Sequence, residues 1–200
     1  MSTEPNVIAL PRGSLTRRLN GPLHRPVLLV FMAIVAGHWL EHLTQAWEVW
    51  VLHWPRTQSR GLLGQAVPWL FRSEQLHYWL AAIMLLGLAL LRPAFVGRAR
   101  GWWTVALVIQ FWHHFEHLLL LGQAISGRYL LGRPVPTSVL QLWFPRIELH
   151  LFYNAIVTVP MVVAVYLHQR PPRTEGAVLP CNCAAPAPAR RLSSAGGEPS

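Results

Sequence analysis

The first long apolar stretch of the chain, at residues 26–51, reads PVLLVFMAIVAGHWLEHLTQAWEVWV. About 20 predominantly apolar residues are enough for an α-helix to cross the hydrocarbon core of a bilayer. Three further stretches reach or approach this length, at residues 75–91, 102–125 and 147–167. The sequence therefore predicts an all-α membrane protein, a bundle of four transmembrane helices.

The composition also favours a membrane protein. Hydrophobic residues make up 52% of the 200 residues and charged residues only 12%, which is about half the charged share of soluble domains. All 17 basic residues are arginines, and they lie in short groups between the apolar stretches. A nucleic-acid-binding protein gathers its basic residues in one patch or stripe instead. Despite the net charge of +9, we therefore expect contact with membrane lipid and none with nucleic acid.

The arginines also predict the orientation of the chain. Eleven lie before the first apolar stretch, between the second and the third, or after the fourth, and six lie in the other two loops. Arginine-rich loops stay predominantly on the cytoplasmic side. We expect a multi-pass protein of the cell membrane with both termini in the cytoplasm. It would comprise a cytoplasmic segment 1–25, a four-helix membrane domain 26–168 and a disordered cytoplasmic tail 169–200.

Two motifs each occur twice in the chain. The repeated pairs are His-x-x-Glu-His at 38–42 and 113–117, and Trp-x-x-Arg-x-Glu at 69–74 and 143–148. The offsets are 75 and 74 residues, and the order of the motifs is the same. This pattern predicts two tandem two-helix repeats, at about 26–92 and 101–168, and an even number of spans makes them parallel. The alternative is chance similarity in a chain rich in Trp, His and Leu.

Six histidines are expected at one depth in the membrane. At 1.5 Å per residue, His38 and His42 lie about 18 and 24 Å along the first helix from its cytoplasmic end, and His113 and His117 about 17 and 23 Å along the third. The other two histidines, at positions 77 and 150, lie one turn into the helices that return from the outer surface. Polar side chains within a bilayer are costly and face the bundle interior. We therefore predict one polar layer in the outer half of the bundle.

This layer has the composition of a transition-metal site. Histidines at i and i+4 and a glutamate at i+3 lie on one face of a helix. Imidazole suits iron, copper and zinc, and four-helix bundles commonly hold dinuclear sites. We predict two transition-metal ions, iron or copper with zinc also compatible, bound by His38, Glu41, His42, Glu74, His77, His113, Glu116, His117, Glu148 and His150. The alternative is that the histidines make only interhelical hydrogen bonds.

The glutamates of this set have different expected roles. Glu41 and Glu116 are the predicted catalytic residues, because a carboxylate there can bridge two metal ions or orient a metal-bound imidazole. Glu74 and Glu148 are either ligands or ion-pair partners of the arginines two positions before them. Glu148 and His150 lie about 200° apart around a regular helix, so both cannot face one site there.

Further residues are expected around the ligands. These neighbours are His114, Asn154, Arg72 and Arg146. The two arginines lie at the outer mouth, where they either contact lipid headgroups or attract an anionic substrate. The two cysteines, Cys181 and Cys183, lie in the polar tail. They are either unused thiols or ligands of a soft metal ion.

These residues fit several functions. We expect a non-haem di-iron or dicopper oxidase or oxygenase that acts on a small or lipophilic molecule at the outer half of the membrane and receives electrons from a donor. The alternatives are a haem b electron carrier, a zinc-dependent membrane hydrolase and a metal or proton transporter. Haem does not account for the four glutamates, and a transporter needs polar steps in the cytoplasmic halves of the helices, which are apolar in this sequence.

Overall fold

The computed structural model describes residues 15–71, 74–172, 179–181 and 183. Within these residues the chain is helical and contains no strand. The elements are α1 (Leu15–Asn20), α2 (His24–Trp50), α3 (Gly61–Ala66), α4 (Pro68–Phe71), α5 (Glu74–Leu91), η1 (Arg92–Ala94), α6 (Gly97–Ser126), η2 (Leu130–Gly132), η3 (Leu140–Leu142) and α7 (Arg146–Gln169). The predicted all-α class is therefore confirmed. Most of the predicted tail and the first 14 residues lie outside the described residues.

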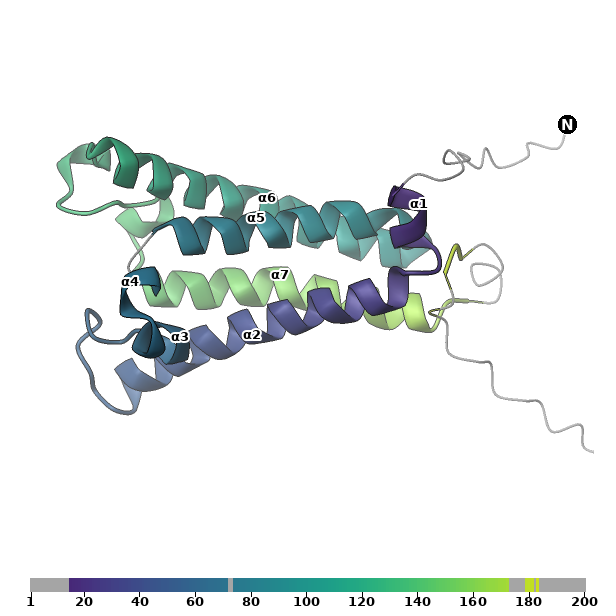
Figure 1. The fold of residues 1–200 in the computed structure, drawn as a ribbon, viewed down its shortest axis with the longest axis horizontal. Helices are drawn as coiled ribbons and strands as arrows, with labels where there is room; N and C mark the ends of the chain where they lie inside the picture. The colour runs from purple at the N-terminus through teal and green to yellow at the C-terminus, as the bar shows by residue number, and fades with distance from the viewer. Residues whose placement is uncertain (1–14, 72–73, 173–178, 182, 184–200) are drawn as a thin grey trace, which may run out of the picture.

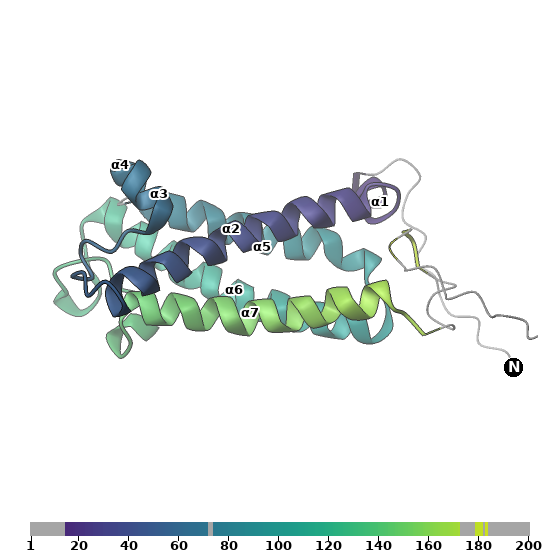
Figure 2. The same ribbon diagram turned by 90° about the horizontal axis from the view of Figure 1, so that it is seen from below.

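The four long helices α2, α5, α6 and α7 lie side by side along the long axis of the molecule (Figures 1 and 2). Each contacts two of the others, α6 between α5 and α7 and α2 between α7 and α5. The short helix α1, the start of α2 and the end of α7 lie at one end, which we call the terminal end (Figure 1). The other end, with α3 and α4, is called the loop end.

Three helical segments among the described residues are long and apolar enough to cross a membrane. They are α2, α5 continued through η1, and α7. This finding supports a membrane protein. The third predicted span is α6, which has 30 residues but is not among the three. Its glutamines, histidines and glutamate lower its hydropathy.

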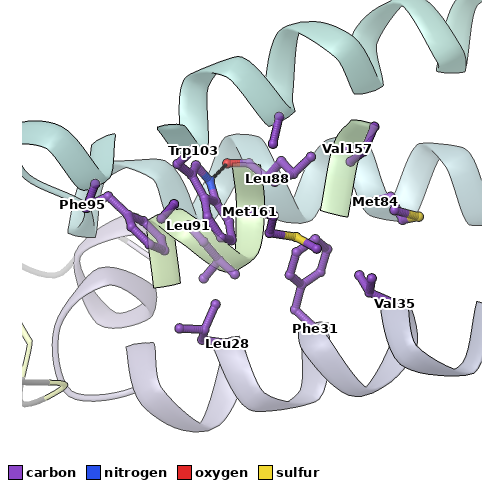
Figure 3. Packing of buried hydrophobic residues seen from close by; sticks show 13 residues of the cluster. Leu28, Phe31, Val35, Met84, Leu88, Leu91, Phe95, Trp103, Val157 and Met161 are labelled. Carbon is purple, nitrogen blue, oxygen red and sulfur yellow. Dashed lines mark hydrogen bonds between the residues drawn. The ribbon is translucent and has the colours of Figure 1, made fainter. Parts of the chain in front are cut away.

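An apolar core fills the terminal half of the bundle (Figure 3). Trp103 of α6 is fully buried, and its indole N–H donates a hydrogen bond to the Leu88 carbonyl of α5 at 2.7 Å. The ring of Phe95 stacks on Trp103 at 4.1 Å between centroids. Gly87 lets α2 approach α5, because a Cβ atom there would collide with the Phe31 ring. Such close packing replaces the hydrophobic effect as the source of helix association where lipid is the solvent.

Candidate metal centre

The structure brings the six predicted histidines together in the loop half of the bundle. At the centre are His113 and His117 of α6 and His150 of α7, whose ligand atoms all lie within 4.8 Å of one another. We call these three residues the histidine triad. The Nε2 atoms of His113 and His117 are 3.2 Å apart. All three side chains are buried.

The other three histidines line up beside the triad. The His42 ring of α2 lies 5.1 Å from His150 between centroids, and His38 lies 4.5 Å from His42. The His77 ring of α5 lies 6.0 Å from His150 and 6.1 Å from His117. All four long helices therefore contribute imidazoles to one group. Their function as metal ligands stays a prediction.

Hydrogen bonds orient two of these rings. The Nδ1 atom of His150 is 2.7 Å from the Arg146 carbonyl oxygen, and that of His42 is 2.8 Å from Oε1 of Gln45. Each Nδ1–H group therefore donates, and the lone pair of each neutral ring is placed on Nε2. Both Nε2 atoms are buried without a hydrogen-bond partner among the described residues. An acceptor in this state is suited to a metal ion, and a neighbour that fixes the tautomer is typical of metal-bound histidine.

Tyr153 of α7 is a member of this group that the sequence analysis did not identify. Its ring lies 4.2 Å from that of His113 between centroids, and it is buried. Its hydroxyl group has no hydrogen-bond partner among the described residues. The available signal was its position three residues after His150, on the same face of α7. A tyrosine hydroxyl beside the triad can donate a proton to a bound ligand.

Glu41 and Glu116, the predicted catalytic residues, contact the backbone of the loops. The carboxylate of Glu41 accepts hydrogen bonds from the N–H groups of Leu63 at 3.0 Å and Gly64 at 3.3 Å, in the first turn of α3. The carboxylate of Glu116 accepts one from the N–H group of Leu140, at the start of η3, at 2.9 Å. Both glutamates thus fasten the covering loops to the helices that hold the histidines. Their role as ligands or bridges stays a prediction.

The contact of Glu41 depends on a glycine. Gly61 has φ +70°, which disfavours any residue with a Cβ atom. A Cβ atom there would also meet Oε1 of Glu41 at 2.5 Å. The N–H group of Gly61 donates to Glu48 at 2.9 Å. Glycine at this position therefore lets two carboxylates of α2 hold α3.

The other two predicted glutamate ligands form ion pairs with arginines from distant parts of the chain. Glu74 accepts two hydrogen bonds from Arg146, at 2.6 and 2.7 Å, and this pair connects α5 with α7. Glu148 pairs with Arg56 at 2.6 Å. The sequence analysis considered local partners at positions 72 and 146, and Arg72 lies outside the described residues. Pro145 precedes a regular α7, in which Glu148 contacts Arg56 while His150 joins the triad.

The two remaining predicted neighbours occupy separate places. The His114 ring lies 5.2 Å from Tyr78 between centroids and is half-buried. Asn154 is buried one turn after His150, but His150 has the Arg146 carbonyl as its hydrogen-bond partner. His114 therefore differs from its neighbour His113 in lying outside the triad, which makes it a natural control position.

Two cavities reach the histidines. One, of about 240 Å³, lies at the loop end and is lined by His42, His77, His150 and the Glu74–Arg146 pair. Arg56 and Arg60 also line it, so its wall is predominantly cationic. The other, of about 220 Å³, lies between α2 and α5 and is lined by His38, His42, His77 and apolar residues, including Ile34 and Leu80. The histidine group is therefore reached by one polar and one apolar route.

A second group of ligand-type side chains lies at the terminal end. It consists of His24, His168, Cys181 and Cys183. The sequence analysis assigned no role to these two histidines and left the cysteines open. Burial raises the pKa of the Cys183 thiol to about 12, and its hydrogen bond with Cys181 adds to this shift.

Comparison with known proteins gives this chain no family. No protein-family model matches it, and no curated protein and no solved structure matches it significantly. Its function must therefore be argued from the geometry above.

Proposed function

We propose that this protein is a membrane metalloprotein in which the six histidines of the loop half bind two transition-metal ions, iron or copper, as the centre of a non-haem oxidase or oxygenase. The observation that carries this proposal is the histidine triad, whose buried nitrogen atoms lie within 4.8 Å of one another. Burying unpaired polar atoms costs about 1–3 kcal/mol each. Metal ions at this position would satisfy several of them at once.

The donor set favours iron or copper in a redox role. Imidazole nitrogen binds iron, copper and zinc, and six imidazoles provide enough ligands for two ions. Glu41 and Glu116 hold backbone N–H groups, which leaves zinc-bound water without a general base among them and disfavours the hydrolase. The tyrosine hydroxyl beside His113 supplies a proton donor to oxygen chemistry. The external electron donor remains part of this proposal.

The space around the triad disfavours haem. The cavity beside the triad, lined by Glu116, Tyr153 and the three histidines among others, offers about 10 Å³ of room for water, enough for roughly one molecule. Cofactor pockets typically exceed roughly 300 Å³. The apolar core of the terminal half likewise disfavours a transporter, because an ion path needs a chain of polar groups.

The two cavities support a lipophilic or small substrate. The apolar opening between α2 and α5 would face the bilayer if both helices cross it. A lipophilic molecule would then reach His38 and His42 laterally, while the cationic cavity at the loop end would admit water and small solutes. Membrane lipid and a small-molecule substrate are the partners that this arrangement suits.

The hydrogen bonds of the two loops support the proposed duplication. Glu41 and Glu116, 75 residues apart, each hold the backbone of the loop that follows their helix. Glu48 and Gln123 are also 75 residues apart, and each accepts a loop N–H, from Gly61 at 2.9 Å and Thr137 at 3.2 Å. We infer two tandem units forming four transmembrane helices, with the loop end outside and both termini in the cytoplasm.

Metal analysis of detergent-purified protein tests the proposal. We expect about two irons or coppers per chain without a Soret band. His113→Ala should lose metal, because it removes a triad nitrogen, whereas the adjacent His114→Ala should keep it. Full metal content in His113→Ala and His150→Ala would contradict the ligand assignment. A Soret band would favour a haem carrier, and zinc alone a hydrolase.

A further inference from the structure

A second cluster of metal-ligand side chains lies at the terminal end of the bundle. His24 is the first residue of α2, and His168 is the last but one of α7. Cys181 and Cys183 follow α7 in the chain. One ligand atom from each of the four side chains lies within 4.8 Å of the others. The Sγ atom of Cys181 is 3.3 Å from Nε2 of His168.

The burial of this cluster is unusual for groups of this polarity. His24 is 0% exposed, His168 1% and Cys181 8%. The Nδ1 atom of His24 is 3.3 Å from the Leu19 carbonyl oxygen, to which its N–H donates. Its Nε2 atom is buried and has no hydrogen-bond partner among the described residues. An unpaired imidazole lone pair beside two thiols calls for a bound cation.

We propose that His24, His168, Cys181 and Cys183 bind one zinc ion in a closed tetrahedral site. Two imidazole nitrogens and two thiolate sulfurs form a common structural zinc set. Bond lengths of about 2.0–2.1 Å to nitrogen and 2.3 Å to sulfur place tetrahedral ligand atoms roughly 3.3–3.8 Å apart. The observed spacing, from 3.3 Å between His168 and Cys181 to at most 4.8 Å, requires only a small contraction.

The surrounding packing orients both histidines for this site. The two imidazole rings lie 5.2 Å apart between centroids and are inclined by 73°. Phe95 packs against both, at 5.6 Å from His24 and 4.5 Å from His168. Phe95 itself is fully buried and stacks on Trp103. The rigid apolar core therefore fixes two of the four ligands before any ion binds.

This ion would have a structural role. It would join the start of α2 to the end of α7, which lie at the same end of the bundle (Figure 1), and hold residues 181 and 183 against both. All four coordination positions are filled by protein, which is typical of structural rather than catalytic zinc. The site differs from the loop-half histidines in its sulfur ligands and in its position beyond the apolar core.

The test uses the full-length protein in detergent, purified under reducing conditions and analysed for metal content. The double variant Cys181→Ser/Cys183→Ser should lose one zinc per chain and keep the metal of the loop-half histidines. His113→Ala is the matched control and should show the reverse. Replacement of zinc by cobalt should give the tetrahedral visible spectrum and a thiolate-to-cobalt charge-transfer band in the wild type, and the double variant should lack that band.

Two results would overturn the proposal. One is an unchanged zinc content and cobalt spectrum in the double variant. The other is a metal-stripped wild-type protein whose two thiols react with a maleimide equally fast with and without added zinc. The second measurement needs no variant, so it decides the question even if the substitutions disturb folding. Metal loss from the loop half alone would contradict the proposed function and leave this site standing.

Discussion

The two halves of the bundle are built from the same four helices but bury opposite kinds of side chain. In the terminal half, the fully buried residues include Leu88, Trp103 and Met161. In the loop half, the buried residues include His117 and Glu116, at 3% exposure each. Polar groups within a membrane protein are costly. Their concentration in one half, in place of an even distribution, indicates that they act together there.

The change between the halves takes place within about two helical turns. On α7, the buried residues pass from His150 and Asn154 to Val157 and Met161. On α6, Gln110 lies between Trp103 and His113, and its side-chain N–H donates to the Ala81 carbonyl at 3.1 Å. The apolar half therefore has the packing of a scaffold, and the polar half contains the chemistry. Substitutions matched across the boundary test this division.

The largest effect is expected in the apolar half, from Trp103→Ala. This substitution empties a fully buried site and removes the hydrogen bond to Leu88. Large aromatic-to-alanine changes in cores cost about 3–5 kcal/mol. We expect a loss of this size in the free energy of unfolding, measured by circular dichroism during denaturation in detergent. Trp102→Ala is the control, since Trp102 is 42% exposed, and equal losses in both variants would contradict a packed scaffold.

A smaller effect is expected at the loop end, from Arg146→Ala. Glu74 is 11% exposed in its side chain and Arg146 is 37% exposed, so the variant leaves a largely buried carboxylate without its partner. Losing a charged hydrogen-bond partner costs about 1–3 kcal/mol, and partial exposure places this pair at the lower end. Arg56→Ala breaks the more exposed pair with Glu148 and should cost at most about 1 kcal/mol. Denaturant titration of both variants measures the difference, and a larger loss in Arg56→Ala would reverse the assignment.

Glu116→Gln separates the two roles of the buried glutamates. The amide oxygen can still accept the Leu140 N–H, so we expect a change of at most about 1 kcal/mol in unfolding free energy. We also expect unchanged metal content, because the carboxylate contacts the loop backbone. Elemental analysis of this variant beside Glu116→Ala, which removes the acceptor, checks both points. Metal loss in Glu116→Gln would show that the carboxylate is a ligand, as the sequence analysis predicted.

The long helices could be predicted closely from the sequence. The apolar stretch 75–91 corresponds to α5 at Glu74–Leu91, and 147–167 corresponds to α7 at Arg146–Gln169. Helix α6 begins at Gly97, five residues before its apolar stretch, because arginine and glycine residues interrupt the hydropathy signal but not the helix. Length and apolar runs therefore determine such elements almost completely.

The partners of the polar residues could be predicted only in part. The depth of each histidine along its helix follows from its distance from the helix end, so the grouping of imidazoles could be anticipated. The partner of Glu74 could not, because Arg146 is 72 residues away and reaches it only through the packing of α5 on α7. Likewise, His24 and Cys181 meet because the chain turns back after α7, and no local pattern indicates that turn.

The smallest effect on stability is expected at the boundary between the halves, from Gly37→Leu. Gly37 lies beside His38 and lines the apolar cavity between α2 and α5, and a Cβ atom there would have no neighbour within 4 Å. A leucine would fill this opening without a clash, and it favours helix over glycine by up to about 1 kcal/mol. We therefore expect unchanged or slightly raised stability, but severalfold slower removal of metal by membrane-permeant phenanthroline. Removal by a sulfonated, water-soluble chelator should keep its rate, because the cavity at the loop end stays open. Gly122→Leu, also at a helical glycine with open space around it, should leave both rates unchanged. Equal slowing by the two chelators in Gly37→Leu would instead place the only entrance at the loop end and remove the argument for a lipophilic substrate.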